Sequence, residues 1–199
     1  MMNIVFDIGN VICEWNPRKL VESVFQNEKE RRCAFTSIIG HNDWLMLDKG
    51  TLGLDEAIPR AVQRCQIAED KVRTLFEETP KSLVPFPETV DLLEELHSKG
   101  FNLYVLSNMH YHAFEYLSST YKFWQLFTGI VISSHIQSIK PEPEIFDHLL
   151  QEHNLVPQNT LFLDDMPVNI AAAEQKGIVA VLVCQISQMR ADLIKRISA

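Results

Sequence analysis

Five polar side chains lie at the ends of apolar stretches of this sequence or in the loops that follow them, and their types suit the transfer of a phosphoryl group: Asp7, Ser107, Lys140, Asp164 and Asp165. An aspartate carboxylate can attack phosphorus and form an aspartyl-phosphate. Two neighbouring carboxylates can hold a hard divalent cation, and Mg²⁺ prefers such oxygen ligands. A serine hydroxyl and a lysine ammonium can stabilise the charge of the transferring group. These residues therefore predict Mg²⁺-dependent chemistry at phosphorus, with Asp7 as the nucleophile.

Each of these residues also has a simpler explanation when it is taken alone. A single aspartate after a strand is commonly a turn or cap residue, Ser107 could cap a helix, and Lys140 could be solvated. The pair Asp164-Asp165 is more informative, because adjacent carboxylates repel unless a cation or hydrogen-bond donors offset them. The pair could still cap the helix that follows it. Capping alone does not explain why all of these residues occur at or just beyond predicted strand ends.

The elements that must position these side chains alternate along most of the chain. Short apolar runs predict five strands, over residues 3–6, 101–106, 129–133, 160–163 and 179–183. Helical spacing predicts helices between the later strands, over residues 87–99, 110–119, 143–153 and 168–176. This alternation is typical of an α/β protein with a doubly wound, parallel five-stranded sheet. Because the carboxyl ends of parallel strands meet at one edge, the polar side chains can converge there.

The stretch 17–83 differs, because its pattern is helical and no convincing strand interrupts it. Leu20, Val21, Val24 and Phe25 share one apolar helix face, and further helices are predicted over residues 43–47, 55–65 and 69–79. We interpret this stretch as a helical cap inserted after the first strand. The chain would then consist of an α/β core domain, residues 1–16 and 84–199, and a cap domain, residues 17–83.

Charge and composition exclude several classes of function. The net charge of −8 argues against a nucleic-acid partner and requires local positive groups or a metal to attract an anionic substrate. The first residues lack a secretory pattern and no apolar run is long enough to cross a membrane, so we expect a cytoplasmic protein without a membrane partner. Cys13, Cys33, Cys65 and Cys184 show no metal-ligand spacing, which predicts reduced thiols. The sequence does not indicate an oligomeric state.

With these motifs in order, the chain resembles the haloacid dehalogenase-like hydrolase superfamily over nearly its whole length. The resemblance rests on Phe6-Asp7-Ile8-Gly9-Asn10-Val11, Val105-Leu106-Ser107-Asn108, Lys140-Pro141 and Phe162-Leu163-Asp164-Asp165, with Asn169 following. Within the superfamily, the motifs are similar to the subgroup of the bacterial α-D-glucose-1-phosphate phosphatase. The resemblance implies a Rossmannoid core with a helical cap. It also implies a Mg²⁺-dependent phosphatase for a small phosphorylated metabolite, such as the sugar phosphate glucose 1-phosphate.

The resemblance also assigns roles to individual residues. It implies that the Gly9 backbone carbonyl binds the metal, that Asn108 joins Ser107 in binding phosphate, and that Asn169 supports the acidic pair from one helical turn away. Lys140 would anchor the nucleophile and the substrate. The implied metal ligands are Asp7, Gly9, Asp164 and Asp165, and the implied substrate contacts are Ser107, Asn108 and Lys140.

One departure from the family pattern concerns proton transfer. Most phosphatases of the superfamily carry a second aspartate two residues after the nucleophile, where this chain has Gly9. Glycine cannot move a proton, and general acid–base catalysis is typically worth about 10²–10⁴-fold. We therefore expect a slower enzyme and not an inactive one. The resemblance to the subgroup, which shares the glycine, also argues for retained activity. Glu14, in the segment leading to the cap, is a candidate substitute acid or an acceptor for a sugar hydroxyl, although it could equally be a solvated carboxylate.

Residues of the cap would then select the substrate. Trp15, Arg18, His41 and Trp44 lie in or near the cap and could contact a sugar ring or a second anionic group, although tryptophan and histidine are also ordinary core residues. His110 follows Ser107 closely and could reach the mouth of the site, or simply begin a helix.

Two alternative functions stay open at this point. A 2-haloacid dehalogenase also attacks through the first aspartate, but at carbon and without a metal, so the pair Asp164-Asp165 favours phosphate over it. A non-catalytic member that binds a phosphorylated ligand or a protein is supported only by Gly9. Retention of the nucleophile, the lysine and the acidic pair weighs against that alternative.

Overall fold

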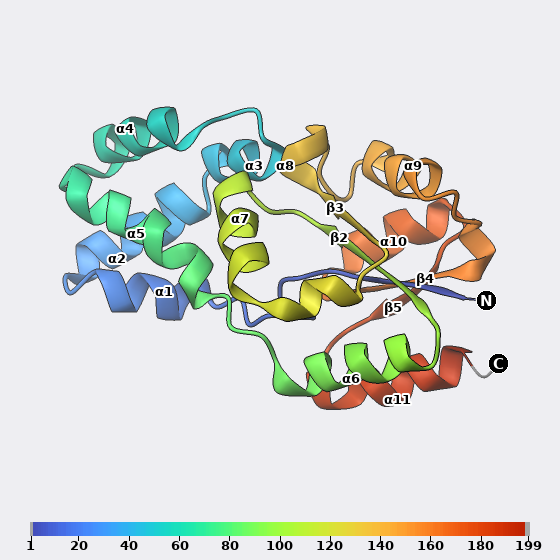
Figure 1. Cartoon of the computed structure of the whole chain (residues 1–199). Helices are drawn as coiled ribbons and strands as arrows, with labels where there is room; N and C mark the ends of the chain where they lie inside the picture. Colours follow the sequence, from blue (N-terminus) through green and yellow to red (C-terminus); the bar gives the residue numbers. More distant parts are fainter. Residues whose placement is uncertain (1, 198–199) are drawn as a thin grey trace.

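The fold of residues 2–197 is described by a computed structural model, and a five-stranded parallel sheet lies at its centre. The strand order β3-β2-β1-β4-β5 places the first strand of the chain in the middle (Figure 1). The strands are β1 (Asn3–Phe6), β2 (Asn102–Ser107), β3 (Gly129–Ile132), β4 (Thr160–Asp164) and β5 (Val179–Leu182). Both neighbours of β1 pair with it in parallel, so the predicted doubly wound α/β sheet is confirmed.

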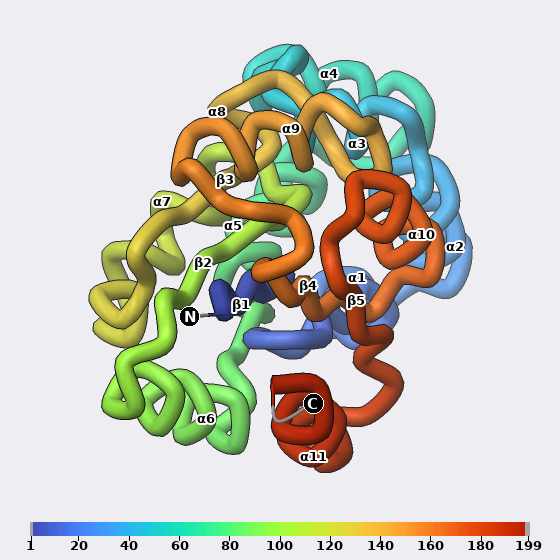
Figure 2. Tube along the Cα trace, turned by 90° about the vertical axis from the view of Figure 1, so that its right-hand side faces the viewer, coloured from blue at the N-terminus to red at the C-terminus, as the bar shows by residue number. Residues whose placement is uncertain are grey.

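Helices cover both faces of this sheet (Figure 2). Val5, Tyr104 and Phe162 face α9 and α10, whereas Ile4 and Phe6 pack in a cluster with residues of α6, α7 and α11. This alternation follows from the two-residue period of a strand, which buries successive side chains on opposite faces. The core helices are α6 (Pro87–Ser98), α7 (Tyr111–Thr120), η2 (Lys122–Leu126), α8 (Ser133–Ile136), α9 (Pro143–Glu152), η3 (Pro157–Asn159), α10 (Pro167–Gln175) and α11 (Ile186–Ile197).

The segment inserted after β1 is entirely helical and lies beyond one end of the sheet (Figure 1). Its helices are α1 (Pro17–Val24), α2 (Glu28–Ala34), η1 (Phe35–Ile39), α3 (Asn42–Lys49), α4 (Leu54–Cys65) and α5 (Glu69–Ser82). They enclose an apolar cluster of their own that includes Leu20, Trp44 and Leu75. This packing supports the proposed division of the chain into cap and core. The helices α2, α8 and α11 and the short helices η1, η2 and η3 were not predicted from the sequence.

Contacts from α3 hold the cap against the core. Lys49 forms a 2.6 Å ion pair with Glu142, and the Ser133 hydroxyl donates a hydrogen bond to the Asp48 carbonyl. Gly50 ends α3 with a φ of 74° and packs against the backbone of Ser134. A side chain at position 50 would collide with that backbone, so glycine is needed both for the turn and for the close approach.

The prediction of reduced thiols was wrong for two of the four cysteines. Cys33 and Cys65 form a disulfide that joins α2 to the end of α4, with their Cα atoms 5.8 Å apart. The two cysteines are 32 residues apart in the sequence, so no local pattern indicated that they pair. Cys13 is free and buried, and burial raises the pKa of its thiol to about 12.

The helices show no candidate for a transmembrane segment. Among residues 2–197, none of them combines the length and the apolar character needed to cross a bilayer.

Candidate active site

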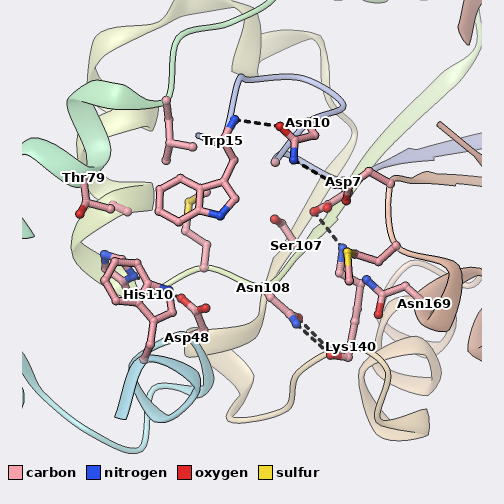
Figure 3. Close-up of a pocket in the computed structure, with 17 residues that line it drawn as sticks. Asp7, Asn10, Trp15, Asp48, Thr79, Ser107, Asn108, His110, Lys140 and Asn169 are labelled. Atoms are coloured by element: carbon pink, nitrogen blue, oxygen red, sulfur yellow. Dashed lines mark hydrogen bonds and ion pairs between the residues drawn. The ribbon is translucent and has the colours of Figure 1, made fainter. Parts of the chain in front are cut away.

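The strand ends and one loop bring the predicted side chains to a single cavity of about 300 Å³ between the sheet edge and the cap. Asp7 follows β1 and Ser107 ends β2, while Lys140 comes from the loop before α9 (Figure 3). Asp165 lines the same cavity just after β4, and Asp164 is fully buried directly behind it. The prediction that these residues converge is therefore confirmed.

Lys140 connects the two central carboxylates. Its Nζ atom lies 2.8 Å from Asp7 Oδ1 and 2.7 Å from Asp164 Oδ2, and it donates a third hydrogen bond to the Leu106 carbonyl at 2.9 Å. Burial alone would lower the pKa of Lys140, but the two carboxylates outweigh it and raise the pKa above its usual value. Lys140 is therefore a fixed positive charge in a chain with an excess of acidic residues.

The pKa of the Asp7 carboxyl group is higher than is usual for an aspartate. Burial raises its pKa to about 6, with the Lys140 charge opposing and the Asp164 charge reinforcing this shift. Its Oδ1 atom also accepts a hydrogen bond from the Ile8 backbone N–H at 2.7 Å, which fixes the carboxylate in one orientation. The perturbed pKa and the position in a cavity are together typical of a functional carboxylate.

The two acidic residues at the end of β4 differ in how many of their carboxylate oxygens are free to bind a metal. Both oxygens of Asp164 are occupied, because Lys140, the Met166 backbone N–H and the Asn169 amide donate to them at 2.7–3.1 Å. Asp165 accepts one hydrogen bond, from Asn10 at 3.0 Å. One oxygen from each of Asp7, Asp164 and Asp165 lies within 4.8 Å of the others. This oxygen-rich donor set fits a hard divalent cation, with Asp165 better placed than Asp164 to touch it directly.

Three asparagines hold the site together. Asn169 donates to Asp164 as predicted. The Asn108 side chain makes two hydrogen bonds to the Lys140 backbone, at 2.7 and 2.8 Å. The Asn108 side chain therefore positions the lysine loop, and because Asn108 also lines the cavity, its contact with phosphate stays a prediction. Asn10, with a φ of 53°, connects Asp165 to the Trp15 backbone. This linking role of Asn10 was not predicted from the sequence.

Glu14 is the predicted site residue that the structure does not bring to the cavity. It is absent from the lining residues, and its carboxylate lies 3.5 Å from Lys19 on the protein surface. The backbone leads it outward, because the Glu14 N–H is bonded to the Val84 carbonyl at the base of the cap. The proposed substitute acid is therefore wrong. Gly9 does line the cavity, and a Cβ atom there would meet only Trp15 at an ordinary 3.7 Å.

The wall opposite Asp7 is built from both the cap and the core (Figure 3). Trp15 and Trp44 stack with ring centroids 5.9 Å apart, and both line the cavity, as does His110. His41 instead caps α3, and Arg18 lies on another part of the cap surface. Asp48, which the sequence analysis missed, lies 3.2 Å from His110. No sequence signal pointed to Asp48, because its partner is 62 residues away.

A parallel α/β core with strand-end carboxylates, a buried lysine and a helical cap defines a class of hydrolases that act through an aspartate nucleophile. The chain belongs to the haloacid dehalogenase-like hydrolase family, whose model matches residues 18–183.

Similar proteins support this assignment over nearly the full length. A sesquiterpene phosphatase of Aspergillus oryzae is 26% identical over 175 residues, covering 88% of this chain and 86% of the relative. A D-ribitol-5-phosphate phosphatase of Bacteroides thetaiotaomicron is 27% identical, covering 88% of each chain. A haloacid dehalogenase family enzyme of Bacteroides thetaiotaomicron, solved with magnesium and inorganic phosphate, matches with a TM-score of 0.74, 21% identity, and coverage of 92% and 93%. At 21% sequence identity, this structural match shows that the two proteins share a fold.

Proposed function

We propose that this protein is a Mg²⁺-dependent phosphatase that hydrolyses a small phosphate monoester through an aspartyl-phosphate on Asp7. The observation that carries the proposal is the bridge from Lys140 to Asp7 and Asp164, with Asp165 close enough to complete a cation site. Curated relatives named as phosphatases support it. We propose Ser107 and Lys140 as the side chains that contact the phosphoryl group.

The residues of the site divide the chemical work. Asp7 attacks phosphorus, and the phosphoryl group moves from the ester oxygen to the carboxylate; water then attacks phosphorus and restores Asp7. Lys140 keeps Asp7 in position and offsets charge on the transferring group, while Ser107 donates a hydrogen bond to a phosphoryl oxygen. Asp7, the Gly9 carbonyl and Asp165 would hold Mg²⁺, with Asn10 bonded to Asp165 and Asn169 holding the neighbouring Asp164. When bound, Mg²⁺ supplies positive charge to both the carboxylate and the phosphate.

The proposed substrate is a sugar phosphate such as glucose 1-phosphate. The relative named as a D-ribitol-5-phosphate phosphatase supports this class of substrate. A second candidate is the phosphate ester of an apolar alcohol. The cap side of the cavity favours this second class, because Trp15, Trp44, Leu83 and Met109 give it an apolar surface. The sesquiterpene phosphatase relative is consistent with such a substrate.

Phosphate release from a panel of esters tests the proposal. We expect hydrolysis of at least one of glucose 1-phosphate, ribitol 5-phosphate and farnesyl phosphate with Mg²⁺, and its loss in excess EDTA. The preferred ester decides between the two substrate classes. Full phosphate release in EDTA would contradict the Mg²⁺ requirement, and chloride release from 2-chloropropionate would instead support a metal-free dehalogenase. Binding of the esters without turnover would support the non-catalytic alternative.

The raised pKa of Asp7 predicts that Mg²⁺ affinity depends on pH. Protons and Mg²⁺ compete for the same carboxylate oxygens, so the metal must displace a proton once the pH falls below about 6. Burial also raises the pKa of Asp165, which adds to the effect. We expect the dissociation constant to rise by at least about tenfold per pH unit below that value. Isothermal titration calorimetry at pH 7.5 and 5.0 measures this, and equal affinities at both would contradict it.

A further inference from the structure

We propose that His110, positioned by Asp48 of the cap, is the general acid and base of this site. This inference rests on the proposed phosphatase function and supplies the role that Gly9 cannot fill and that Glu14 is too remote to take. His110 lines the cavity and is only 5% exposed. Its Nε2 atom is buried and has no hydrogen-bond partner among residues 2–197. A buried polar atom of this kind costs free energy unless a ligand satisfies it.

Asp48 determines which ring nitrogen of His110 is free. Asp48 Oδ1 lies 3.2 Å from His110 Nδ1, and the two side chains are only 14% and 7% exposed. An ionised carboxylate can only accept a hydrogen bond, so Nδ1 carries a proton in this pair. Nε2 is then the atom that gains and loses a proton. The edge of the His110 ring rests against Trp44, with centroids 5.5 Å apart and planes at 87°, which limits rotation of the ring.

The backbone near this pair is connected across the boundary between cap and core. Ser133 donates its hydroxyl proton to the Asp48 carbonyl and accepts a hydrogen bond from the Met109 backbone N–H at 2.9 Å. The ion pair between Lys49 and Glu142 fastens the same end of α3. Asp48 from the cap and His110 from the core are thus held together only when the cap is docked. A general base oriented by a third group in this way is a recurring arrangement in enzymes.

The position of His110 suits contact with the leaving group. In Figure 3, Asp7 and Lys140 lie on one side of the cavity, His110 and Asp48 lie on the other, and Ser107 lies between them. In phosphoryl transfer the nucleophile and the leaving oxygen are roughly in line on opposite sides of phosphorus. A phosphate held by Ser107 and Lys140 therefore directs its ester oxygen away from Asp7, toward the wall that contains His110.

The proton transfers balance over the two half-reactions. Asp7 forms a bond to phosphorus, the bond from phosphorus to the ester oxygen breaks, and that oxygen keeps the electron pair and takes the Nε2 proton of the His110 imidazolium. The alcohol leaves and His110 is neutral. Neutral Nε2 then takes a proton from the water that attacks phosphorus, and the bond from phosphorus to Asp7 breaks with its electrons returning to the carboxylate. Inorganic phosphate leaves, and His110 is an imidazolium again.

Three esters of similar size test this role through their leaving groups: p-nitrophenyl, phenyl and benzyl phosphate. The p-nitrophenolate ion departs without a proton, whereas the benzyl alkoxide needs one. With Mg²⁺ present, we expect His110→Gln to lower kcat/KM for benzyl phosphate by at least about 10²-fold and for p-nitrophenyl phosphate by less than about threefold. Because hydrolysis of the aspartyl-phosphate also needs the base, p-nitrophenol should appear in a burst of one equivalent per site.

Two further variants complete the test. Asp48→Asn should produce the same dependence on the leaving group with a smaller loss, because an amide can donate to Nδ1 and favour the wrong tautomer. His112→Gln is the matched control on the exposed face of α7 and should leave all three rates unchanged. An equal loss for all three esters, or no loss for benzyl phosphate, would overturn the role of His110. Failure of the wild-type protein to hydrolyse any of these esters, or glucose 1-phosphate, ribitol 5-phosphate and farnesyl phosphate, would instead reject the phosphatase function itself.

Discussion

Asp7→Asn is expected to abolish phosphate release, with turnover reduced by at least about 10⁴-fold. The amide keeps the shape of the carboxylate but cannot attack phosphorus, and it removes one oxygen from the cation site. The measurement is phosphate release under saturating substrate and Mg²⁺, with a sensitive phosphate assay. Asp91→Asn, an identical substitution at an exposed position of α6, is the matched control and should retain full activity.

The stability of the same variant separates loss of chemistry from loss of fold. Burial raises the pKa of Asp7 to about 6 from 3.8, so the folded protein binds its proton more tightly than the unfolded chain. Ionised Asp7 therefore lowers the free energy of unfolding. This destabilisation is complete above pH 6, shrinks as the pH falls from 6 to 3.8, and is absent below 3.8. A neutral asparagine avoids the cost, so Asp7→Asn should melt at or above the wild-type temperature at pH 7. An active variant, or an inactive one that is unfolded, would contradict this assignment.

Lys140→Met is expected to impair both stability and catalysis. The substitution leaves Asp7 and Asp164 without their shared cation, although they are only 8% and 0% exposed. Removing one partner of a buried ion pair typically costs about 3–5 kcal/mol of unfolding free energy. The loss of a fixed positive charge beside phosphorus should also reduce turnover by about 10²–10³-fold or more. Urea denaturation at pH 7 and the phosphate assay measure the two effects.

The pH dependence identifies the cause of the instability. Without Lys140, the two carboxylates hold their protons more tightly in the folded protein, so the destabilisation should shrink as the pH falls toward 5. Lys122→Met, at an exposed position of η2, should change neither property and serves as the control. A Lys140→Met protein as stable at pH 7 as the wild type would show that the bridge to Asp7 and Asp164 is not the interaction described here.

The sequence by itself determined the sheet and the main reactive groups. The local periodicity of apolar residues predicts the strands and helices, and the carboxyl ends of parallel strands must lie at one edge of the sheet. Asp7, Ser107 and the pair Asp164-Asp165 could therefore be placed at one site without knowledge of any contact. Lys140 was found by the same ordered pattern, although it comes from a loop.

Only the tertiary structure decided the contacts between segments that are distant in sequence. The bond between His110 and Asp48 and the Cys33–Cys65 disulfide join residues 62 and 32 positions apart, and no local pattern encodes which partners meet. Glu14 failed as a prediction for a related reason. Proximity in sequence to Asp7 says little about direction, because a short turn of the backbone sends the Glu14 side chain out to Lys19 while Asn10 and Trp15 stay at the cavity.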